Sequence, residues 1–459
     1  MRAKASGLSS ISRFAGRALA WVAAALAAGA LGGSYALGQT KASSTASAAS
    51  SQPLGTLIMA GGGVRFDNEA IWSQIVRSAA EYARGKNGPM ATAAVGSAAI
   101  DSRPRIAVLA TASADPLRAS QRIIAALEKY GASGFLVPVA IDKLPRDYRQ
   151  AVNDSEVAAQ IESAHGVYFS GGSQARLLTA LRTSDGKPTP VLSAIRRVHA
   201  RGGVVAGNSA GAAVMSHVIC RDARYLLQVL KNGVTKGKEV DDGFGFLDSN
   251  WFIDQHFLAR GRIARALVIM RQFGVRYGLG IDEETAVVVR SGQAEVVGRR
   301  GAILLDLSRA TQDEKVSGFN LADARLSYLD DGDRLDLTNL RITPAADKLA
   351  EPPIDPASPS FRPDSNDPIV ANDILANSVL LDVMKRLMDN RRGEALGMAY
   401  DGHAAQGGPT QGFEFRISKR QGTMAWSTSK SGVEEWTISG IRLDVRPIMV
   451  RGPITASAN

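Results

Sequence analysis

The chain has 459 residues, of which 45% are hydrophobic and 21% are charged, and it carries 54 Lys and Arg against 44 Asp and Glu. These globular values exclude a mainly disordered chain and a polytopic membrane protein, and the length indicates more than one structural unit. The single cysteine, Cys220, excludes a disulfide framework and a multi-cysteine metal site, and five scattered histidines without an HExxH motif argue against a zinc protease.

The N-terminus has the order of a secretory signal peptide. Four basic residues precede an apolar run over residues 18–31, which is shorter than the roughly 20 residues that a membrane span needs. Small residues follow, so we expect a signal peptide over residues 1–38 and a flexible Ser/Ala-rich linker over residues 39–54. The alternative is an uncleaved anchor. Cleavage predicts a secreted or periplasmic protein with no stable membrane insertion after processing.

Apolar strands alternate with helices through the first part of the chain. The expected strands cover residues 56–60, 105–110, 134–140, 166–169, 203–206 and 278–281. Such alternation predicts an α/β fold in which helices cover both faces of a doubly wound, three-layer, mostly parallel sheet. Because the sites of these folds lie at the carboxyl ends of the strands, the residues directly after each strand are the candidates for function.

After residue 285 the pattern changes to short strands joined by tight turns. A stretch rich in Pro, Asp and Ser over residues 344–371 indicates a linker. A helix and further alternating strands then predict a small α+β C-terminal extension over residues 372–459. We therefore expect a main domain over residues 55–343, followed by this linker and extension.

The segment over residues 203–213 has the pattern of a strand, a sharp turn and a helix. Within it, Gly207-Asn208-Ser209-Ala210-Gly211 fits the G-x-S-x-G pattern of a nucleophile elbow. In such a turn the hydroxyl of Ser209 projects above the sheet, and the amide of Ala210 faces a developing oxyanion. We expect Ser209 to be a nucleophile; the alternative is an ordinary strand-to-helix turn.

A serine nucleophile needs a base, and His256 is the best placed of the five histidines. It follows an apolar run, as a residue at the end of a strand would. His165 and His199 precede strands and belong at the opposite edge of the sheet, His217 lies eight residues along the helix from the serine, and His403 lies in the C-terminal part. The alternative is a buried structural histidine.

The base in turn needs a carboxylate to hold its ring. The acidic run Asp282-Glu283-Glu284 follows the next strand and offers three, and Asp254 is a fourth. We prefer Glu283, and the alternative for the run is a solvated loop. The order serine, histidine, acid differs from the serine, acid, histidine order of the α/β-hydrolases, so a different scaffold is expected.

A second candidate loop, Gly171-Gly172-Ser173-Gln174, follows the fourth predicted strand. A glycine pair lets backbone amides point at an oxyanion, and the Gln174 amide offers a donor and an acceptor to a substrate backbone. The alternative is an ordinary strand-to-helix loop with Gln174 in the first helical turn.

Taken together, these motifs resemble those of the cyanophycinases, serine peptidases related to dipeptidase E that have a glutamine-amidotransferase-like fold. The resemblance covers about residues 55–343. It is carried, in chain order, by Gly171-Gly172-x-Gln174, Gly207-Asn208-Ser209-Ala210-Gly211-Ala212, Asp254-Gln255-His256-Phe257, Arg260-Gly261-Arg262 with Arg265, Gly280-Ile281-Asp282-Glu283 and Asp331-Gly332-Asp333-Arg334-Leu335-Asp336-Leu337.

The resemblance implies a set of site residues. Ser209 would be the nucleophile, His256 the base and Glu283 the carboxylate that orients it. The amides of Gly172 and Ala210 would form an oxyanion hole. The residues implied around the substrate are Gln174, Asp254, Gln255, Arg260, Arg262 and Arg265.

The implied activity is that of a secreted serine peptidase acting on cyanophycin, a poly-aspartate that carries arginine on each side-chain carboxyl. It would cleave aspartyl α-peptide bonds through an acyl-enzyme and release β-Asp-Arg dipeptides, without a metal or cofactor. The family suggests a homodimer, and the chain has no basic patches interleaved with aromatic residues of the kind that bind nucleic acid. The alternatives are a secreted aspartyl dipeptidase or isopeptidase of the same superfamily and a non-catalytic binding protein on this fold.

Overall fold

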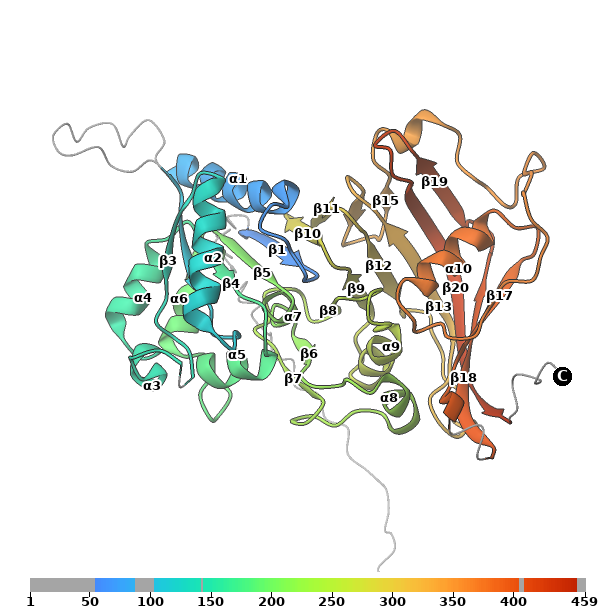
Figure 1. Cartoon of the computed structure of the whole chain (residues 1–459), viewed down its shortest axis with the longest axis horizontal. Helices are drawn as coiled ribbons and strands as arrows, with labels where there is room; N and C mark the ends of the chain where they lie inside the picture. The colour runs from blue at the N-terminus through green and yellow to red at the C-terminus, as the bar shows by residue number, and fades with distance from the viewer. Residues whose placement is uncertain (1–53, 87–102, 142, 404–407, 452–459) are drawn as a thin grey trace, which may run out of the picture. The chain divides into compact units, whose positions relative to one another are not determined.

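Short strands form the first sheet (Figure 1), and the strands at its centre are apolar and buried. In the computed structural model, which describes residues 54–86, 103–141, 143–403 and 408–451, this sheet has nine strands. In spatial order they are β15 (Ile342–Thr343), β14 (Arg334–Asp336), β11 (Gln293–Gly298), β10 (Thr285–Arg290), β1 (Thr56–Ala60), β5 (Val204–Asn208), β4 (Gly166–Phe169), β2 (Arg105–Leu109) and β3 (Ser133–Leu136). The strands from β1 to β3 are parallel, and the others continue the sheet antiparallel. The predicted signal peptide and, except for Leu54, the predicted linker lie outside the described residues.

Helices cover both faces of this sheet because its central strands are apolar on both sides. Ile58 of β1 belongs to one core, whereas its neighbours Leu57 and Met59 belong to the core on the other face. The first core is completed by α1 (Glu69–Lys86) and α2 (Pro116–Lys129). The helices of the other face are α3 (Tyr148–Ala151), α4 (Ser155–Glu162), α5 (Gln174–Leu181), α6 (Pro190–Ala200) and α7 (Ala210–Ala213). The predicted α/β class and its three-layer arrangement are confirmed.

A second sheet contains the strands that lead into the predicted His256 and Glu283 positions. In spatial order its strands are β16 (Val370–Ala371), β17 (Glu394–Ala399), β18 (Thr410–Ser418), β20 (Glu435–Val450), β13 (Leu321–Leu329), β12 (Ala302–Asp306), β9 (Tyr277–Ile281) and β8 (Trp251–Gln255), with β19 (Met424–Thr428) beside β20. β8 and β9 pair in parallel, as do β16 and β17, and the remaining pairs are antiparallel. Three helices contribute to its core: α8 (Leu226–Asn232), α9 (Ile263–Gln272) and α10 (Val379–Met388). β6 (Val218–Cys220) and β7 (Val240–Asp242) form a separate pair.

The C-terminal strands extend this second sheet. β13 pairs with β12 on one side and with β20 on the other, so the strands after residue 369 continue the sheet that begins at β8 (Figure 1, orange to red). The predicted linker over residues 344–371 contains a 3-10 turn, η2 (Lys348–Ala350), and the strand β16. All the residues that the structure describes, from 54 to 451 with the gaps given above, belong to one compact unit. The predicted domain boundaries at residues 343 and 371 stay predictions.

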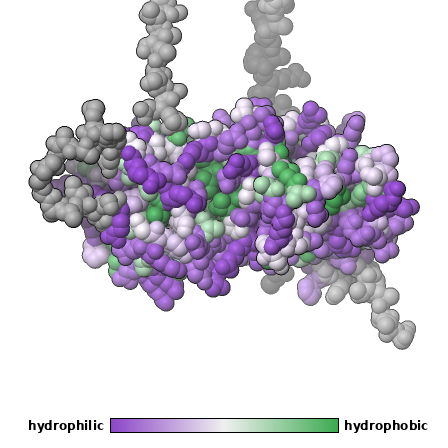
Figure 2. Space-filling model, turned by 90° about the horizontal axis from the view of Figure 1, so that it is seen from above, coloured by the Kyte–Doolittle hydropathy of each residue, from purple (hydrophilic) through white to green (hydrophobic). Residues whose placement is uncertain are grey.

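The surface is mixed in polarity. Polar residues predominate on the face shown in Figure 2, with apolar residues in smaller groups between them. Among the residues that the structure describes, the most exposed large apolar side chains are Leu54, Tyr225, Val433 and Met449. No helix within the described ranges is long and apolar enough to cross a membrane.

Candidate active site

Ser209 occupies a strained turn between β5 and α7. Its φ of 52° and ψ of −114° lie in a region that non-glycine residues rarely adopt, as the elbow pattern predicts. Its amide donates to Ala60 O at 2.9 Å, which ties the turn to the end of β1. Only small neighbours fit here, since a Cβ atom on Gly211 would lie 2.3 Å from Phe169 O and one on Gly207 would lie 2.7 Å from the Gly211 backbone.

His256 and Glu283 reach Ser209 from the second sheet. His256 directly follows β8, with a φ of 48°, and Glu283 lies two residues after β9. The His256 Nε2 atom is 2.9 Å from Ser209 Oγ, and its Nδ1 atom is 2.6 Å from Glu283 Oε1. A carboxylate only accepts, so Nδ1 carries the ring proton and Nε2 is left to accept the proton of the serine hydroxyl. The structure therefore brings together the three residues that the sequence predicts, across the two sheets.

Burial keeps the His256 ring neutral. Burial lowers the pKa of His256 below its ordinary value and outweighs the hydrogen bond to Glu283, which raises it; the nearby charges of Arg260 and Arg262 lower the pKa further. The imidazole is therefore unprotonated at neutral pH. A neutral ring with a free Nε2 lone pair is the form that a general base requires.

The other carboxylates near the base have different partners in the described part of the chain. Asp282 is buried; its Oδ1 accepts from the Ala259 amide at 3.0 Å and its Oδ2 from Arg300 at 3.3 Å. Glu284 accepts from the Arg65 amide at 2.9 Å and from the Asn68 side chain at 2.7 Å. Glu283 is thus the member of the acidic run that contacts His256.

The glycine run after β1 packs directly on these residues, and this role is missed by the sequence analysis. A Cβ atom on Gly62, which has a φ of 108°, would lie 2.4 Å from the His256 ring. One on Gly63, which has a φ of 61°, would lie 3.3 Å from Glu283 Cβ. The sequence signal was available, since three consecutive glycines stand at the carboxyl end of a predicted strand.

The second glycine loop lies beside the serine. A Cβ atom on Gly171 would lie 3.4 Å from Ser209 Cβ, and one on Gly172, which has a φ of 141°, would lie 2.0 Å from Ala112 O. Within the described residues, no acceptor is bound by the amides of Gly172 and Ala210. Gln174 is the first residue of α5, and its half-buried side chain likewise makes no hydrogen bond there. These donors are therefore free for a ligand.

Asp254 and Arg265 form a buried ion pair behind the site. Arg265 Nε donates to Asp254 Oδ2 at 2.7 Å, and its Nη2 donates to the other carboxylate oxygen. Burial raises the pKa of Asp254, but the charges of Arg265 and Arg262 outweigh it and hold that pKa below its ordinary value. The sequence places both residues around the substrate, whereas the structure buries both against each other, out of contact with solvent.

Gln255 and Arg262 lie between this pair and the serine. Gln255 is buried, and its Oε1 atom lies 3.2 Å from Ser209 Oγ, where it competes with the nearer His256 Nε2 for the single hydroxyl proton. Arg262 donates to Gln255 O at 2.6 Å and is mostly buried, which lowers its pKa to about 10. The guanidinium is still charged at neutral pH, and its charge acts on His256.

Arg260 differs from its neighbours because its side chain is 54% exposed. Its Nη2 atom is 3.9 Å from Glu283 Oε1, so the guanidinium lies at the open side of the site. Of the three arginines that the sequence singles out, this one can contact a ligand without a rearrangement.

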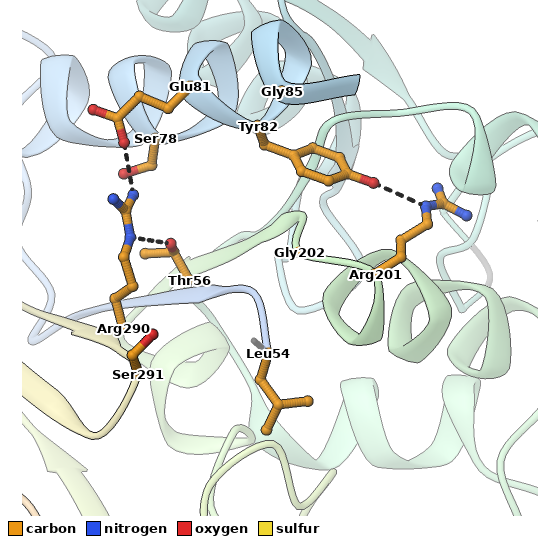
Figure 3. Close-up of a pocket in the computed structure, with 10 residues that line it drawn as sticks. All are labelled: Leu54, Thr56, Ser78, Glu81, Tyr82, Gly85, Arg201, Gly202, Arg290 and Ser291. Carbon is orange, nitrogen blue, oxygen red and sulfur yellow. Dashed lines mark hydrogen bonds and ion pairs between the residues drawn. The ribbon is translucent and has the colours of Figure 1, made fainter. Parts of the chain in front are cut away.

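The cavity drawn in Figure 3 lies at the amino ends of the central parallel strands of the first sheet. Its volume is about 590 Å³, and its lining includes Thr56, the first residue of β1, and Gly202, which precedes β5. Ser209 lies beyond the opposite ends of these parallel strands. Figure 3 shows Arg290 bonded to Glu81 and to Thr56 inside this cavity. The cavity is therefore separate from the candidate active site.

Within the described ranges, no cluster of three or more His, Cys, Asp or Glu side chains could hold a metal ion. The chemistry available at the site is thus a serine hydroxyl bonded to a neutral imidazole, an imidazole bonded to a carboxylate, free backbone amides and an exposed guanidinium.

Several known proteins are similar in sequence to this chain. Residues 97–297 match the sequence profile of peptidase family S51. A cyanophycinase from Trichormus variabilis is 32% identical over 260 residues, which cover 54% of this chain and 80% of the relative. A cyanophycinase from Geminocystis herdmanii is 28% identical over 239 residues, covering 50% of this chain and 81% of the relative. A solved peptidase from an acI-B1 Actinobacterium aligns with a TM-score of 0.42 at 20% identity, over 62% of this chain and 98% of that chain.

The first relative is matched over 80% of its own length. The family profile spans residues 97–297, a range that includes Ser209, His256 and Glu283. The chain therefore belongs to peptidase family S51 and is a serine-type peptidase.

Proposed function

We propose that this peptidase hydrolyses cyanophycin at its aspartyl α-peptide bonds and releases β-Asp-Arg dipeptides through an acyl-enzyme. The hydrogen-bonded chain from Ser209 Oγ through His256 to Glu283, with distances of 2.9 Å and 2.6 Å, carries the proposal. The substrate is suggested by relatives that are named cyanophycinases and are up to 32% identical.

Acylation needs one proton acceptor and one oxyanion site. His256 Nε2 takes the proton of Ser209 Oγ while that oxygen attacks the aspartyl α-carbonyl carbon. The amides of Gly172 and Ala210 then donate to the oxyanion, an effect worth roughly 3 kcal/mol per donor in serine peptidases. When the carbon–nitrogen bond breaks, His256 returns the proton to the leaving amine, and Glu283 stabilises the transient imidazolium.

Deacylation repeats these steps with water. His256 takes a proton from a water molecule, whose oxygen attacks the acyl carbon, and then returns the proton to Ser209 Oγ as the ester breaks. The products are a free carboxylate and the regenerated serine. None of these steps requires a metal or cofactor.

The polymer offers a carboxylate and a guanidinium on every side chain. Arg260 is the exposed cation next to Glu283, and we propose that it binds the carboxylate of an arginyl side chain through paired hydrogen bonds. The free amide side chain of Gln174 is proposed to hold the substrate backbone. Asp254 and Arg265 support this surface from below rather than contact the substrate.

We further propose that residues 1–38 direct the protein to the periplasm or the medium, and that it acts there as a homodimer. The order of basic, apolar and small residues supports export. N-terminal sequencing of the protein recovered from the culture medium or periplasm tests the cleavage, and light scattering during size-exclusion chromatography tests the dimer.

The activity is tested by incubating the purified protein and a Ser209→Ala variant with insoluble cyanophycin. We expect clearing and release of β-Asp-Arg from the wild type and neither from the variant. A fluorophosphonate probe is added in parallel to label a reactive Ser209. No clearing by a folded protein that still takes the probe would overturn the substrate and direct the search to short aspartyl peptides. No labelling would overturn the assignment of Ser209 as the nucleophile.

A further inference from the structure

The loop between β8 and α9, residues 256–262, carries His256, Arg260 and Arg262. Its inner side is fixed by the core. The His256 amide donates to Gly61 O at 2.7 Å, and the Ala259 amide donates to Asp282 Oδ1 at 3.0 Å. These bonds restrain the start of the loop. The exposed Arg260 lies further along it, where the chain turns before α9.

The outer side of the loop is covered by the C-terminal part of the chain. Residues 374–378, here called the brace, directly precede α10 and lie against this loop. The amide of Ser378 donates to Leu258 O at 3.1 Å. Gly261, with a φ of 56°, approaches so closely that a Cβ atom on it would lie 2.0 Å from Leu375 O. No residue with a side chain fits at this contact without displacing one of the two backbones.

The brace is itself held by the second sheet. The amide of Ile374 donates to Met398 O in β17 at 2.9 Å, and the Ile374 side chain is buried. A Cβ atom on Gly397 would lie 2.7 Å from that side chain, so the brace packs tightly on β17. The loop that bears Arg260 is thereby clamped between the core and the C-terminal strands.

We propose that the brace is a positioning element of the active site: contact between Leu375 and Gly261 holds Arg260 at the open side of the site, where it meets the substrate. The part of the proposal that concerns the substrate rests on the proposed function. The physical reason is preorganisation, since a cation on an unsupported loop must be ordered at each binding event and binds its carboxylate correspondingly less well. This gives the segment beyond residue 371 a role in substrate binding.

A Gly261→Ala variant tests the contact, with Gly274→Ala as its matched control. Both glycines have positive φ, of 56° and 68°, so both substitutions impose similar backbone strain. Only Gly261 faces another backbone; a Cβ atom on Gly274 would have no neighbour within 4 Å. The difference between the two variants therefore isolates the clash with the brace.

Three measurements on the purified full chain are compared. For Gly261→Ala we expect KM for cyanophycin to rise about 10-fold or more, with kcat and the rate of fluorophosphonate labelling changed less than about 3-fold, because the displaced group binds substrate rather than the serine proton. Hydrogen exchange, read by mass spectrometry, should quicken at residues 257–262 and at the Ser378 amide. The control should match the wild type in all three.

These measurements separate positioning of Arg260 by the brace from a disturbance of His256 and from a failure of the proposed function. Equal KM values and equal exchange in the two variants would overturn the proposal. A loss of labelling together with activity would show that Gly261→Ala disturbs His256 and would equally reject a role confined to substrate positioning. If the wild type does not cleave cyanophycin, the proposed function fails, and the exchange comparison still reports whether the brace fixes the loop.

Discussion

Asp254 and Arg265 form a two-pronged ion pair directly behind Gln255 and His256. Asp254 is 1% exposed and Arg265 is 4% exposed, and the pair joins the end of β8 to α9. The Gln255 amide donates to the same carboxylate at 2.9 Å. The pair therefore fixes the point at which the chain leaves the second sheet toward Ser209.

Removing one member of this pair should destabilise the protein strongly. In Asp254→Asn the Arg265 charge stays buried without its partner, and we expect the free energy of unfolding to fall by about 3–5 kcal/mol. Urea unfolding followed by circular dichroism measures it. Asp67→Asn is the control, because the Arg65–Asp67 pair lies on the surface and should contribute little. Equal effects of the two substitutions would contradict a buried, structural role for Asp254.

Because of the Asp254 carboxylate, we also expect the stability of the protein to fall at acidic pH. Its pKa is lower in the folded protein than its ordinary value of 3.8, so its contribution is present above that value and is lost as the pH falls through the lowered pKa. The unfolding midpoint of the wild type should decline in this acidic range, and that part of the decline should be missing in Asp254→Asn. A decline of the same size in both proteins would assign it to other carboxylates.

The pH dependence of activity should follow His256. Its neutral form is the base, so kcat/KM should fall as the pH falls through its pKa, which lies below the ordinary 6.5. Glu283→Gln removes a hydrogen bond that raises this pKa, so the acid limb should move to lower pH while the plateau drops by about 10³- to 10⁴-fold. Rate profiles measured with a short soluble aspartyl peptide, where one is cleaved, or with cyanophycin, show both changes.

Arg260→Ala should shift the acid limb of kcat/KM in the direction opposite to that of Glu283→Gln. The Arg260 charge lowers the pKa of His256, so its removal should move the acid limb to higher pH. Shifts of Glu283→Gln and Arg260→Ala in the same direction would be inconsistent with His256 as the group that titrates.

Much of this site could be predicted from the sequence because each residue follows a strand. Ser209 directly follows β5 of the first sheet, and His256 and Glu283 follow β8 and β9, which pair in parallel in the second sheet so that their carboxyl ends lie side by side. The three-layer part of the fold followed from the same alternation of strands and helices. Local pattern was sufficient to place each residue at the end of a strand, whereas the approach of the second sheet to Ser209 depends on pairing between distant segments.

Other features depend on distant pairing or on burial, which a single sequence does not encode locally. Leu326 in β13 pairs with Ile441 in β20, and nothing near either residue specifies the other. An aspartate and an arginine occur equally in an exposed, substrate-binding surface and in a buried ion pair. Only the packing of α9 on β8 shows that Asp254 and Arg265 form a buried pair. The contact of Gly62 with the imidazole likewise arises from a loop nearly 200 residues earlier in the chain.

The Gly62 contact predicts an activity defect with little loss of structure. A methyl group at Gly62 would overlap the His256 ring at 2.4 Å, and displacement of the imidazole should lower kcat/KM by about 10²-fold. Gly131→Ala is the control, because its φ of 96° gives comparable strain and a Cβ atom there would have no neighbour within 4 Å. Fluorophosphonate labelling and peptide hydrolysis should both slow in Gly62→Ala and stay unchanged in Gly131→Ala. Full labelling of Gly62→Ala would contradict the geometry.

Lys348 and Asp333 connect the predicted linker to the rest of the fold. Lys348 Nζ donates to Asp333 Oδ1 at 2.9 Å, and both side chains are fully buried. The other carboxylate oxygen of Asp333 accepts from Thr437 Oγ1 in β20 at 2.6 Å. The Asp333 carboxylate, directly before β14, thus binds both the predicted linker and the last strand. The sequence motif around Asp333 does not predict these contacts.

Lys348→Met should leave the Asp333 charge buried and unpaired, and we expect the free energy of unfolding to fall by about 3–5 kcal/mol. Adding Asp333→Asn removes that charge, so the double variant should regain part of the loss, and a double-mutant cycle measures the coupling. Lys187→Met serves as a control at the exposed Lys187–Asp185 pair. If the single and double variants lose equal stability, the defect comes from packing around Lys348 rather than from the buried charge.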